Sequence, residues 1–211
     1  MRLYLVRHGE TMSNIEGRIQ GHLDAELNET GKLQARLLAR RLQGERFKAI
    51  YSSDLSRAWM TADVIAQAHE LPVHRTELLR EAMLGVWQGH TSAELAEIYP
   101  EEFRKYKFDP IMHRPPGGER LEDVIARCQT FVEEVVTEYP AGNLLAVGHG
   151  GSIRGIICAV FGFSPQFYRR IKLDNASITI IDLLEDRPVL VGLNDLCHLE
   201  DAQMADEPQE Y

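Results

Sequence analysis

Short apolar runs alternate along the chain with segments in which apolar residues recur every three or four positions. Each run spans only a few residues and ends at polar residues or glycine, which is typical of strands buried on both faces. The predicted strands cover residues 3–6, 47–51, 72–73 and 143–148. Because helical segments separate them, we expect these strands to be mainly parallel.

The helical segments carry apolar stripes with the spacing of a single helix face. The clearest stripe lies between about residues 120 and 138, and others begin near Leu33, Ala58 and Ile153. Asn28 or Thr30 is a suitable N-cap for the first of these helices, and residues 52–54 offer Ser, Ser and Asp as caps for the next. The chain therefore predicts strand–helix units along most of its length.

Three regions depart from this alternation. Glycine and proline interrupt residues 82–118, which predicts an irregular flap with short helices over a pocket. Residues 176–184 and 189–193 are rich in β-branched side chains on either side of a turn at Asp186, and they predict a terminal hairpin. The chain ends in an acidic tail at about 200–211.

Residues 1–211 are expected to form a single domain, because no linker-like segment or internal repeat divides the chain. Its fold class is predicted as α/β, a three-layer α/β/α sandwich with a mainly parallel mixed sheet. The flap is expected to lie over the C-terminal ends of the strands. In sheets of this kind the ligand site lies just beyond those ends.

The formal net charge of −9 argues against a nucleic-acid or membrane partner, because either would need a basic face. An anionic ligand must then be held by a local cluster of arginines. Cys128, Cys158 and Cys197 lack paired spacing, so we expect neither disulfides nor a zinc site but buried thiols in a reducing compartment. No segment is apolar over the length of a membrane span, and a cytoplasmic location is expected.

Two arginines and two histidines lie close to predicted strand ends. Arg7 and His8 follow the first strand, Arg57 lies in the first turn of the helix after the second, and His149-Gly150 follows the strand before the last helix. We expect these residues to converge in one crevice. Guanidinium groups suit phosphate oxygens, and imidazole is a nucleophile for phosphorus or a donor to developing charge. Each residue alone has an ordinary structural explanation, but their joint placement predicts a phosphoryl site.

The same residues belong to motifs that resemble those of the histidine phosphatase superfamily, which includes the phosphoglycerate mutases. The motifs occur in the family's order over nearly the whole chain: Arg7-His8-Gly9-Glu10-Thr11 with Asn14, Ser53 and Arg57 with Ala58 and Thr61, Leu79-Arg80-Glu81 with Gly85, Trp87 and Gly89, Gly148-His149-Gly150, and Asn194-Asp195 with His198. In two features the sequence resembles the phosphatase branch, which has broad-specificity members, more than the cofactor-dependent mutases. It has Trp87 near the acid motif, and its flap lacks a long Arg- and Pro-rich insertion.

This resemblance implies a metal-independent phosphomonoesterase without a cofactor. His8 would be the nucleophile that forms a phosphohistidine intermediate, which requires a neutral ring whose other nitrogen donates to a carbonyl oxygen. Glu81 would be the general acid and base at the ester oxygen. The implied ligands of the phosphoryl group and substrate are Arg7, Asn14, Gln20, Gly21, Arg57, His149 and the Gly150 amide.

Alternatives stay open. A mutase shares the first half-reaction and returns the phosphoryl group to the substrate, a non-catalytic module would only bind a phospho-ligand, and a metal-dependent hydrolase would need a ligand spacing that is absent here. The substrate is a small phosphate ester: a phosphoglycerate, phosphoserine, a sugar phosphate, an α-ribazole phosphate or a broad range. The oligomeric state is open between a monomer and a homodimer. The flap offers cations for a carboxylate clamp at Arg104, Lys105, Lys107 and Arg114.

Overall fold

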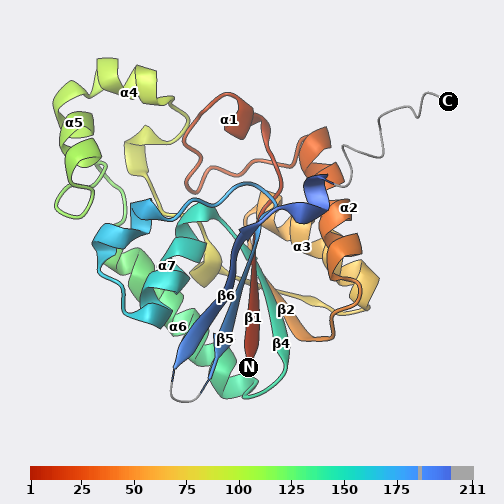
Figure 1. Cartoon of the computed structure of the whole chain (residues 1–211). Helices are drawn as coiled ribbons and strands as arrows, with labels where there is room; N and C mark the ends of the chain where they lie inside the picture. Colours follow the sequence, from red (N-terminus) through yellow and green to blue (C-terminus); the bar gives the residue numbers. More distant parts are fainter. Residues whose placement is uncertain (185–186, 201–211) are drawn as a thin grey trace.

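The computed structural model describes residues 1–184 and 187–200, which contain a six-stranded sheet (Figure 1). Its strands are β1 (Arg2–Arg7), β2 (Phe47–Ser53), β3 (Val73–Thr76), β4 (Asn143–Gly148), β5 (Ile178–Leu183) and β6 (Pro188–Asp195). They lie in the order β3-β2-β4-β1-β5-β6. The first four strands are mutually parallel, while β5 and β6 form an antiparallel hairpin on β1. The prediction of a mainly parallel mixed sheet is confirmed.

Helices cover both faces of the sheet (Figure 1). Successive residues of a strand point to opposite faces, so each central strand packs against helices on both sides. On β1, Leu3 and Leu5 pack in a core with α6 (Leu121–Glu138) and α7 (Gly150–Phe161), whereas Tyr4 and Val6 pack in a second core with α2 (Glu29–Leu42) and α3 (Ser56–His69). The helices of the body are α1 (Met12–Ile15), α2 (Glu29–Leu42), α3 (Ser56–His69), α6 (Leu121–Glu138) and α7 (Gly150–Phe161). The predicted three-layer α/β/α arrangement is confirmed.

α2 and α3 are capped in different ways at their N-termini. α2 follows Asn28, one of the two predicted caps, whose side chain accepts a hydrogen bond from a first-turn amide at 2.8 Å. The caps predicted for α3 at residues 52–54 are wrong, because the residue before the helix is Leu55, which has no capping side chain. Asp24 of the first loop instead accepts hydrogen bonds from the amide and hydroxyl of Ser56, both at 2.7 Å. A tertiary contact therefore replaces the local cap and ties the first loop to α3.

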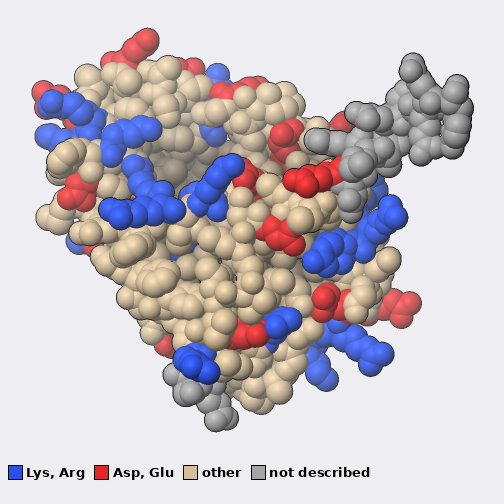
Figure 2. All heavy atoms as spheres, in the orientation of Figure 1, with Lys and Arg blue, Asp and Glu red and all other residues tan. Residues whose placement is uncertain are grey.

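The flap, residues 82–118, stands beside the edge at which β1 and β4 end (Figure 1). Its small apolar core includes Trp87 and Phe103, whose rings meet edge to face with centroids 5.5 Å apart. Lys and Arg side chains gather around the hollow between the flap and the body (Figure 2). The flap elements are η2 (Gly85–Trp87), α4 (Ser92–Ile98) and α5 (Pro100–Phe108), and the other 3-10 helices are η1 (Glu77–Leu79) and η3 (Pro165–Arg170).

The structure corrects one expectation about the cysteines. Cys128 and Cys158 are buried, but Cys197, which follows the edge strand β6, is exposed. The predicted turn at Asp186 and the tail at 201–211 lie outside the described residues. Among the helices that are described, none has both the length and the apolar character needed to cross a membrane.

Gly31 in the first turn of α2 lies against the loop after β1. A Cβ at this position would come 2.1 Å from the Glu10 carbonyl oxygen, so the helix or the loop would have to move. We expect Gly31→Ala to lower the free energy of unfolding by about 1–3 kcal/mol. Gly44→Ala is the matched control, because a Cβ there would meet no atom within 4 Å. Urea unfolding measures both variants, and unchanged stability of Gly31→Ala would contradict this close approach.

Candidate active site

The predicted site residues at the ends of β1, β2 and β4 meet at one edge of the sheet. The register pairs Arg7 of β1 with Gly148 of β4, so His8 and His149 follow the two strands side by side. Their ring centroids lie 5.0 Å apart. Arg57 reaches the same place from the first turn of α3, and its side chain is fully buried. Two imidazoles and two guanidinium groups thus share one largely buried site.

His8 is a neutral ring with one unprotonated nitrogen. Its Nδ1 lies 2.7 Å from the Gly9 carbonyl oxygen, which can only accept, so the proton lies on Nδ1. Burial lowers the pKa of His8 well below its ordinary value of 6.5, and the positive charges of Arg7 and Arg57 lower it further. The Nε2 atom therefore keeps the lone pair that a nucleophile needs.

His149 has the opposite tautomer. Its Nδ1 accepts a hydrogen bond from Arg57 Nε at 3.2 Å, so the proton lies on Nε2. Burial lowers the pKa of His149 well below its ordinary value, and the charge of Arg57 acts in the same direction. Within the described part of the chain, the buried Nε2 atom has no hydrogen-bond partner. It is therefore a donor that a ligand oxygen can satisfy.

Arg57 also fixes the first loop. Its terminal nitrogens donate to the carbonyl oxygens of Gly21 and Leu23 at 2.7 and 2.9 Å. Burial lowers the pKa of Arg57 to about 10, although the nearby Glu81 carboxylate opposes this shift. The side-chain oxygen of Gln20, next in the chain to Gly21, is buried without a partner among the described residues. The loop that carries both predicted substrate ligands is thus held against the site.

The remaining predicted phosphate ligands each retain a hydrogen-bond donor. One terminal nitrogen of Arg7 donates to the Leu173 carbonyl oxygen at 2.6 Å, while its buried Nε has no partner in the described chain. The side-chain oxygen of Asn14 accepts from the Thr11 amide at 3.1 Å, which leaves its NH₂ group for another acceptor. Gly150 is the first residue of α7, so its amide has no partner within the helix.

Asn175, which the sequence analysis missed, fixes the loop after β1. Its side-chain nitrogen donates to the carbonyl oxygens of His8 and Gly9 at 3.0 and 3.3 Å, and lies 3.3 Å from the Asn14 side-chain oxygen. It stands in an irregular segment between η3 and β5, where no periodic pattern distinguishes it from any other polar residue. Asn175 therefore orients both His8 and Asn14 from the opposite end of the chain.

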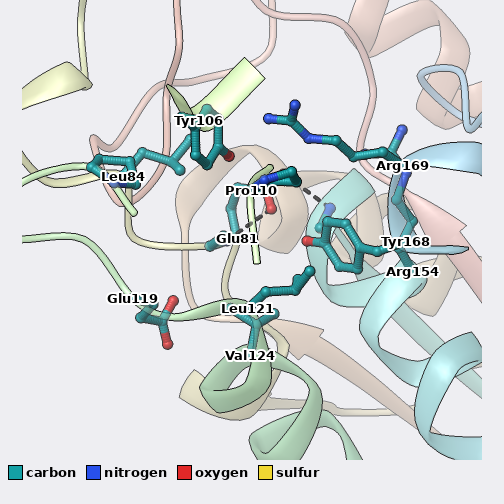
Figure 3. A pocket seen from close by; sticks show the side chains of 13 residues that line it. Glu81, Leu84, Tyr106, Pro110, Glu119, Leu121, Val124, Arg154, Tyr168 and Arg169 are labelled. Atoms are coloured by element: carbon teal, nitrogen blue, oxygen red, sulfur yellow. Dashed lines mark hydrogen bonds between the residues drawn. The ribbon is translucent and has the colours of Figure 1, made fainter. Parts of the chain in front are cut away.

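Glu81 approaches the site from the loop after η1 (Figure 3). Its two carboxylate oxygens accept hydrogen bonds from the amides of Ala82 at 2.8 Å and Gly151 at 3.2 Å. A Cβ on Gly151 would lie 1.7 Å from the Glu81 carboxylate, so a glycine is required for this approach. The His22 ring, to which the sequence analysis assigned no role, donates to the Glu81 carbonyl oxygen at 2.8 Å. The carboxylate is therefore held beside the N-terminus of α7.

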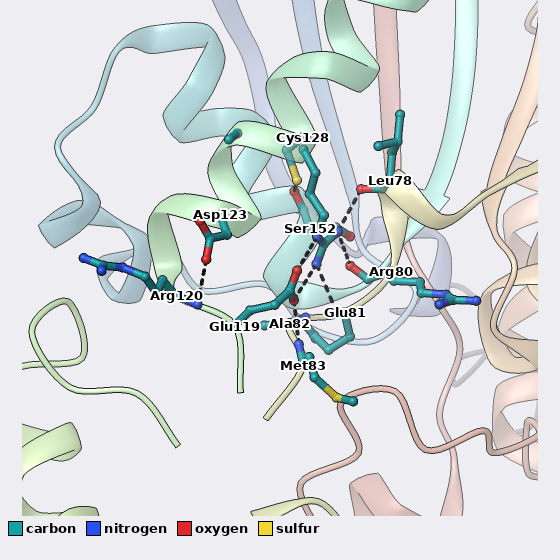
Figure 4. A network of polar contacts seen from close by, with 12 residues as sticks. Leu78, Arg80, Glu81, Ala82, Met83, Glu119, Arg120, Asp123, Cys128 and Ser152 are labelled. Carbon is teal, nitrogen blue, oxygen red and sulfur yellow. Dashed lines mark hydrogen bonds and ion pairs between the residues drawn. The ribbon is translucent and has the colours of Figure 1, made fainter. Parts of the chain in front are cut away.

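Arg127 on α6, also missed, holds the loop that carries Glu81. Its guanidinium donates to the carbonyl oxygens of Leu78 and Arg80, both at 2.8 Å, and of Glu81 at 3.1 Å. It also forms an ion pair with Glu119 at 3.0 Å, and Figure 4 shows these partners gathered around one point. In the sequence this arginine adjoins an apolar stripe, where a solvated side chain is the ordinary expectation. Only the tertiary contacts reveal its position.

The flap cations considered for a carboxylate clamp are exposed, and none of them lines the pocket beside Glu81. They are Arg104, Lys105, Lys107 and Arg114. Arg154 of α7 and Arg169 of η3 line that pocket instead. The structure therefore gives no support for a carboxylate clamp made by these four flap residues at this pocket.

The fold and the site together define an α/β protein whose neutral imidazoles and largely buried guanidinium groups lie together at the C-terminal ends of parallel strands. The model of the histidine phosphatase superfamily (branch 1) matches residues 3–196. The chain belongs to this superfamily and is an enzyme of the phosphatase class. The resemblance to this superfamily that the sequence motifs indicated is confirmed.

The relatives extend over most of the chain. Phosphoserine phosphatase 1 of Hydrogenobacter thermophilus is 39% identical over 199 residues, which cover 94% of either chain. The metal-independent phosphoserine phosphatase of Arabidopsis thaliana is 35% identical over 200 residues, or 93% of this chain and 82% of the relative. Among solved structures, YhfR of Bacillus stearothermophilus is similar with a TM-score of 0.88 and 32% identity, covering 94% of this chain and 98% of that one.

The protonation states of His8 and His149 predict how stability depends on pH. In the folded chain both rings stay neutral well below pH 6.5, whereas in the unfolded chain they take up protons there. The unfolded chain then binds more protons, so acidification favours it. The contribution of the neutral rings to the free energy of unfolding is complete above pH 6.5. It is lost as the pH falls, by up to about 1.4 kcal/mol per pH unit for each ring.

His8→Asn should therefore remove one ring's share of the slope of unfolding free energy against pH between pH 6.5 and about 5. Urea unfolding at several pH values in this window measures the slope. His113→Asn is the control, because this histidine is exposed in the flap. If His8→Asn keeps the wild-type slope, the His8 ring is not held neutral by the fold.

Proposed function

We propose that this protein is a metal-independent phosphomonoesterase that acts on small phosphorylated metabolites through a phosphohistidine intermediate on His8. The observation that carries the proposal is the pair of opposite tautomers, in which His8 presents a lone pair and His149 presents an N–H group. The guanidinium groups of Arg7 and Arg57 lie beside both rings and lower their pKa values. A phosphoryl group would satisfy the donors while its phosphorus faces the lone pair.

In the first step, His8 Nε2 attacks phosphorus in line with the ester bond. The P–O bond to the alcohol breaks as the P–N bond forms, and Glu81 gives its proton to the departing oxygen. The ring gains positive charge, which the Nδ1–H hydrogen bond to the Gly9 carbonyl stabilises. The oxygens of the transferred group are bound by Arg7, Asn14, Arg57, His149 and the Gly150 amide.

In the second step, water attacks the phosphohistidine. Glu81, now a carboxylate, takes a proton from the water as the new P–O bond forms and the P–N bond breaks. His8 leaves as a neutral ring and inorganic phosphate is released. The same carboxylate thus serves as acid and then as base, which requires the fixed position that the amide of Gly151 gives it.

Cationic side chains supply the charge that a metal ion would otherwise provide. Four buried donors, on Arg7, Arg57, His149 and Gly150, converge on the site. In residues 1–184 and 187–200, no group of three or more His, Cys, Asp or Glu side chains is arranged to hold a metal ion. The name of the Arabidopsis relative agrees with a reaction that needs no metal.

The superfamily also contains phosphoglycerate mutases, a name that other relatives of this chain carry. A mutase must retain its dephosphorylated intermediate until the phosphoryl group returns to it. The cations of the flap do not line the pocket beside Glu81. Water is the proposed acceptor because relatives that are 39% and 35% identical to this chain are named as phosphoserine phosphatases. The same names make phosphoserine a first candidate substrate.

The test is to incubate chelator-treated protein with O-phosphoserine, 3-phosphoglycerate, glucose 6-phosphate and p-nitrophenyl phosphate. We expect free phosphate and an acid-labile phosphoprotein, and His8→Ala should lower phosphate release at least about 1,000-fold. Isomerisation of 3-phosphoglycerate with little release would identify a mutase instead. Binding without either reaction would identify a non-catalytic module, and activity that returns only with a divalent cation would contradict metal independence.

Glu81→Gln removes the proton that the departing alcohol needs. We expect kcat/KM for glycerol 3-phosphate to fall by about 10²–10⁴-fold, and that for p-nitrophenyl phosphate to fall much less, because nitrophenolate leaves without protonation. Phosphate release and nitrophenol absorbance measure the two rates. Glu101→Gln on the exposed surface of α5 is the control. Equal losses for the two esters would show that Glu81 does not protonate the leaving group.

A further inference from the structure

The two ends of the flap meet beside the loop that carries Glu81 (Figure 4). The Glu119 amide donates to the Met83 carbonyl oxygen at 2.8 Å, and the Met83 amide donates to the Glu119 carboxylate at 2.7 Å. Met83 lies two residues after Glu81. Glu81 and Glu119 also line the same cavity of about 200 Å³ (Figure 3). The base of the flap and the proposed general acid are therefore joined over only a few residues.

Arg127 of α6 binds both parts of this junction. Its Nε and one terminal nitrogen donate to the Glu119 carboxylate at 3.0 and 3.3 Å. Its terminal nitrogens also donate to three carbonyl oxygens in residues 78–81, including that of Glu81 itself. Each N–H group of the guanidinium therefore has an acceptor. The side chains of Arg127 and Glu119 are only 16% and 24% exposed, so water screens their charges less than it would on an open surface.

This ion pair also sets part of the charge around the Glu81 carboxyl group. A positive charge near a carboxyl group favours its ionised form, which cannot give a proton, and a negative charge favours its protonated form. Arg127 and Glu119 carry one charge of each sign, and both bind the loop of Glu81. Removing one charge leaves the other unbalanced. The two removals should therefore act on proton transfer in opposite directions.

Other ionisable groups act on the Glu81 carboxylate from several elements. They are Arg7 of β1, Arg57 of α3, Cys128 of α6, and Tyr106, Arg154, Tyr168 and Arg169 around the cavity. The His22 ring binds the carbonyl oxygen of Glu81 instead of its carboxylate. A substitution in the Glu119–Arg127 pair leaves all of these groups in the chain. A difference between such variants therefore reports on the pair.

We propose that Glu119 and Arg127 are positioning residues for proton transfer by Glu81. Arg127 fixes the backbone from which the Glu81 side chain extends. Glu119 balances the charge of Arg127, so that Glu81 can hold the proton that the departing oxygen needs. Because Glu119 also closes the base of the flap, the same pair joins the cavity wall to the acid. The inference rests on the proposed function and concerns its acid–base step.

The first test measures kcat/KM for glycerol 3-phosphate against pH. Wild-type activity should fall on the alkaline side as the acid loses its proton. Glu119→Gln leaves the Arg127 charge unbalanced and should move this alkaline limb to lower pH by about half a unit or more. Arg127→Gln leaves the Glu119 charge unbalanced and should move the limb to higher pH, and the double variant should return it to the wild-type position. A loss of stability alone would not produce shifts of opposite sign.

The second test separates the geometry of the pair from its charge. Arg127→Lys keeps the positive charge, but an ammonium group cannot bind three carbonyl oxygens and a carboxylate at once. We expect the alkaline limb to keep its wild-type position. We also expect kcat/KM for glycerol 3-phosphate to fall about tenfold or more and that for p-nitrophenyl phosphate to fall much less, because nitrophenolate leaves without a proton.

Arg2→Gln and Asp182→Asn are the matched controls. These two residues form an ion pair at 2.7 Å, and Arg2 lies at the opposite end of β1 from Arg7. Both variants should keep the wild-type pH profile and the wild-type ratio between the two esters. Shifts of the same profile in these controls would show that any ion pair of the fold has this effect and would overturn the inference.

An alkaline limb that stays in place in Glu119→Gln, or limbs that move in the same direction in the two single variants, would also overturn it. Glu119→Gln keeps acceptors for Met83 and Arg127, so it gives this reading even if Arg127→Gln does not fold. Equal losses for the two esters in Arg127→Lys would contradict the positioning of the acid. Phosphate release from p-nitrophenyl phosphate by the wild type separates these failures from that of the proposed function, which predicts such release without reference to the pair.

Discussion

The structure depends most on the buried hydrogen bond from Arg57 to His149. Burial is the main reason why the pKa of both imidazoles is lowered, and the positive charge that this bond places beside them lowers it further, so both rings stay neutral. It also sets the tautomer of His149, so that the other ring nitrogen points a proton at the site. The same guanidinium binds two carbonyl oxygens of the first loop. One side chain therefore connects the electrostatics of the site to the course of the backbone around it.

A second feature is that arginines near the site bind backbone carbonyl oxygens more than carboxylates. Arg7, Arg57, Arg127 and Arg154 all donate to carbonyl groups, and of these four only Arg127 also pairs with an acid. A carbonyl oxygen fixes the direction of a guanidinium group without cancelling its charge. The site can then be positive in a chain that is acidic as a whole. This explains how an acidic chain can hold an anionic substrate.

The two ends of a phosphate ester would meet different parts of the molecule. Strand ends and the N-terminus of α7 form the phosphoryl site, where burial is nearly complete and small changes in geometry alter the chemistry. The flap, α6 and η3 form most of the neighbouring cavity, which Glu81 and Gly151 join to the phosphoryl site. The flap residues Leu84, Tyr106, Pro110 and Pro115 in its lining are distant in the chain from His8. This division explains how one fold supports relatives named for different reactions.

The sequence by itself determined the sheet, the layers of helices and the clustering of Arg7, His8, Arg57 and His149, because strand periodicity and parallel order fix which residues end at the same edge. Tertiary structure alone decided the cap of α3 by Asp24, the roles of Asn175 and Arg127 in orienting the loops, and the placement of Arg154 and Arg169 at the cavity in place of the flap cations. These contacts join segments that are distant in the chain and irregular in pattern. Periodicity reports which face of an element is buried, but the partner of a single polar side chain depends on how the elements pack.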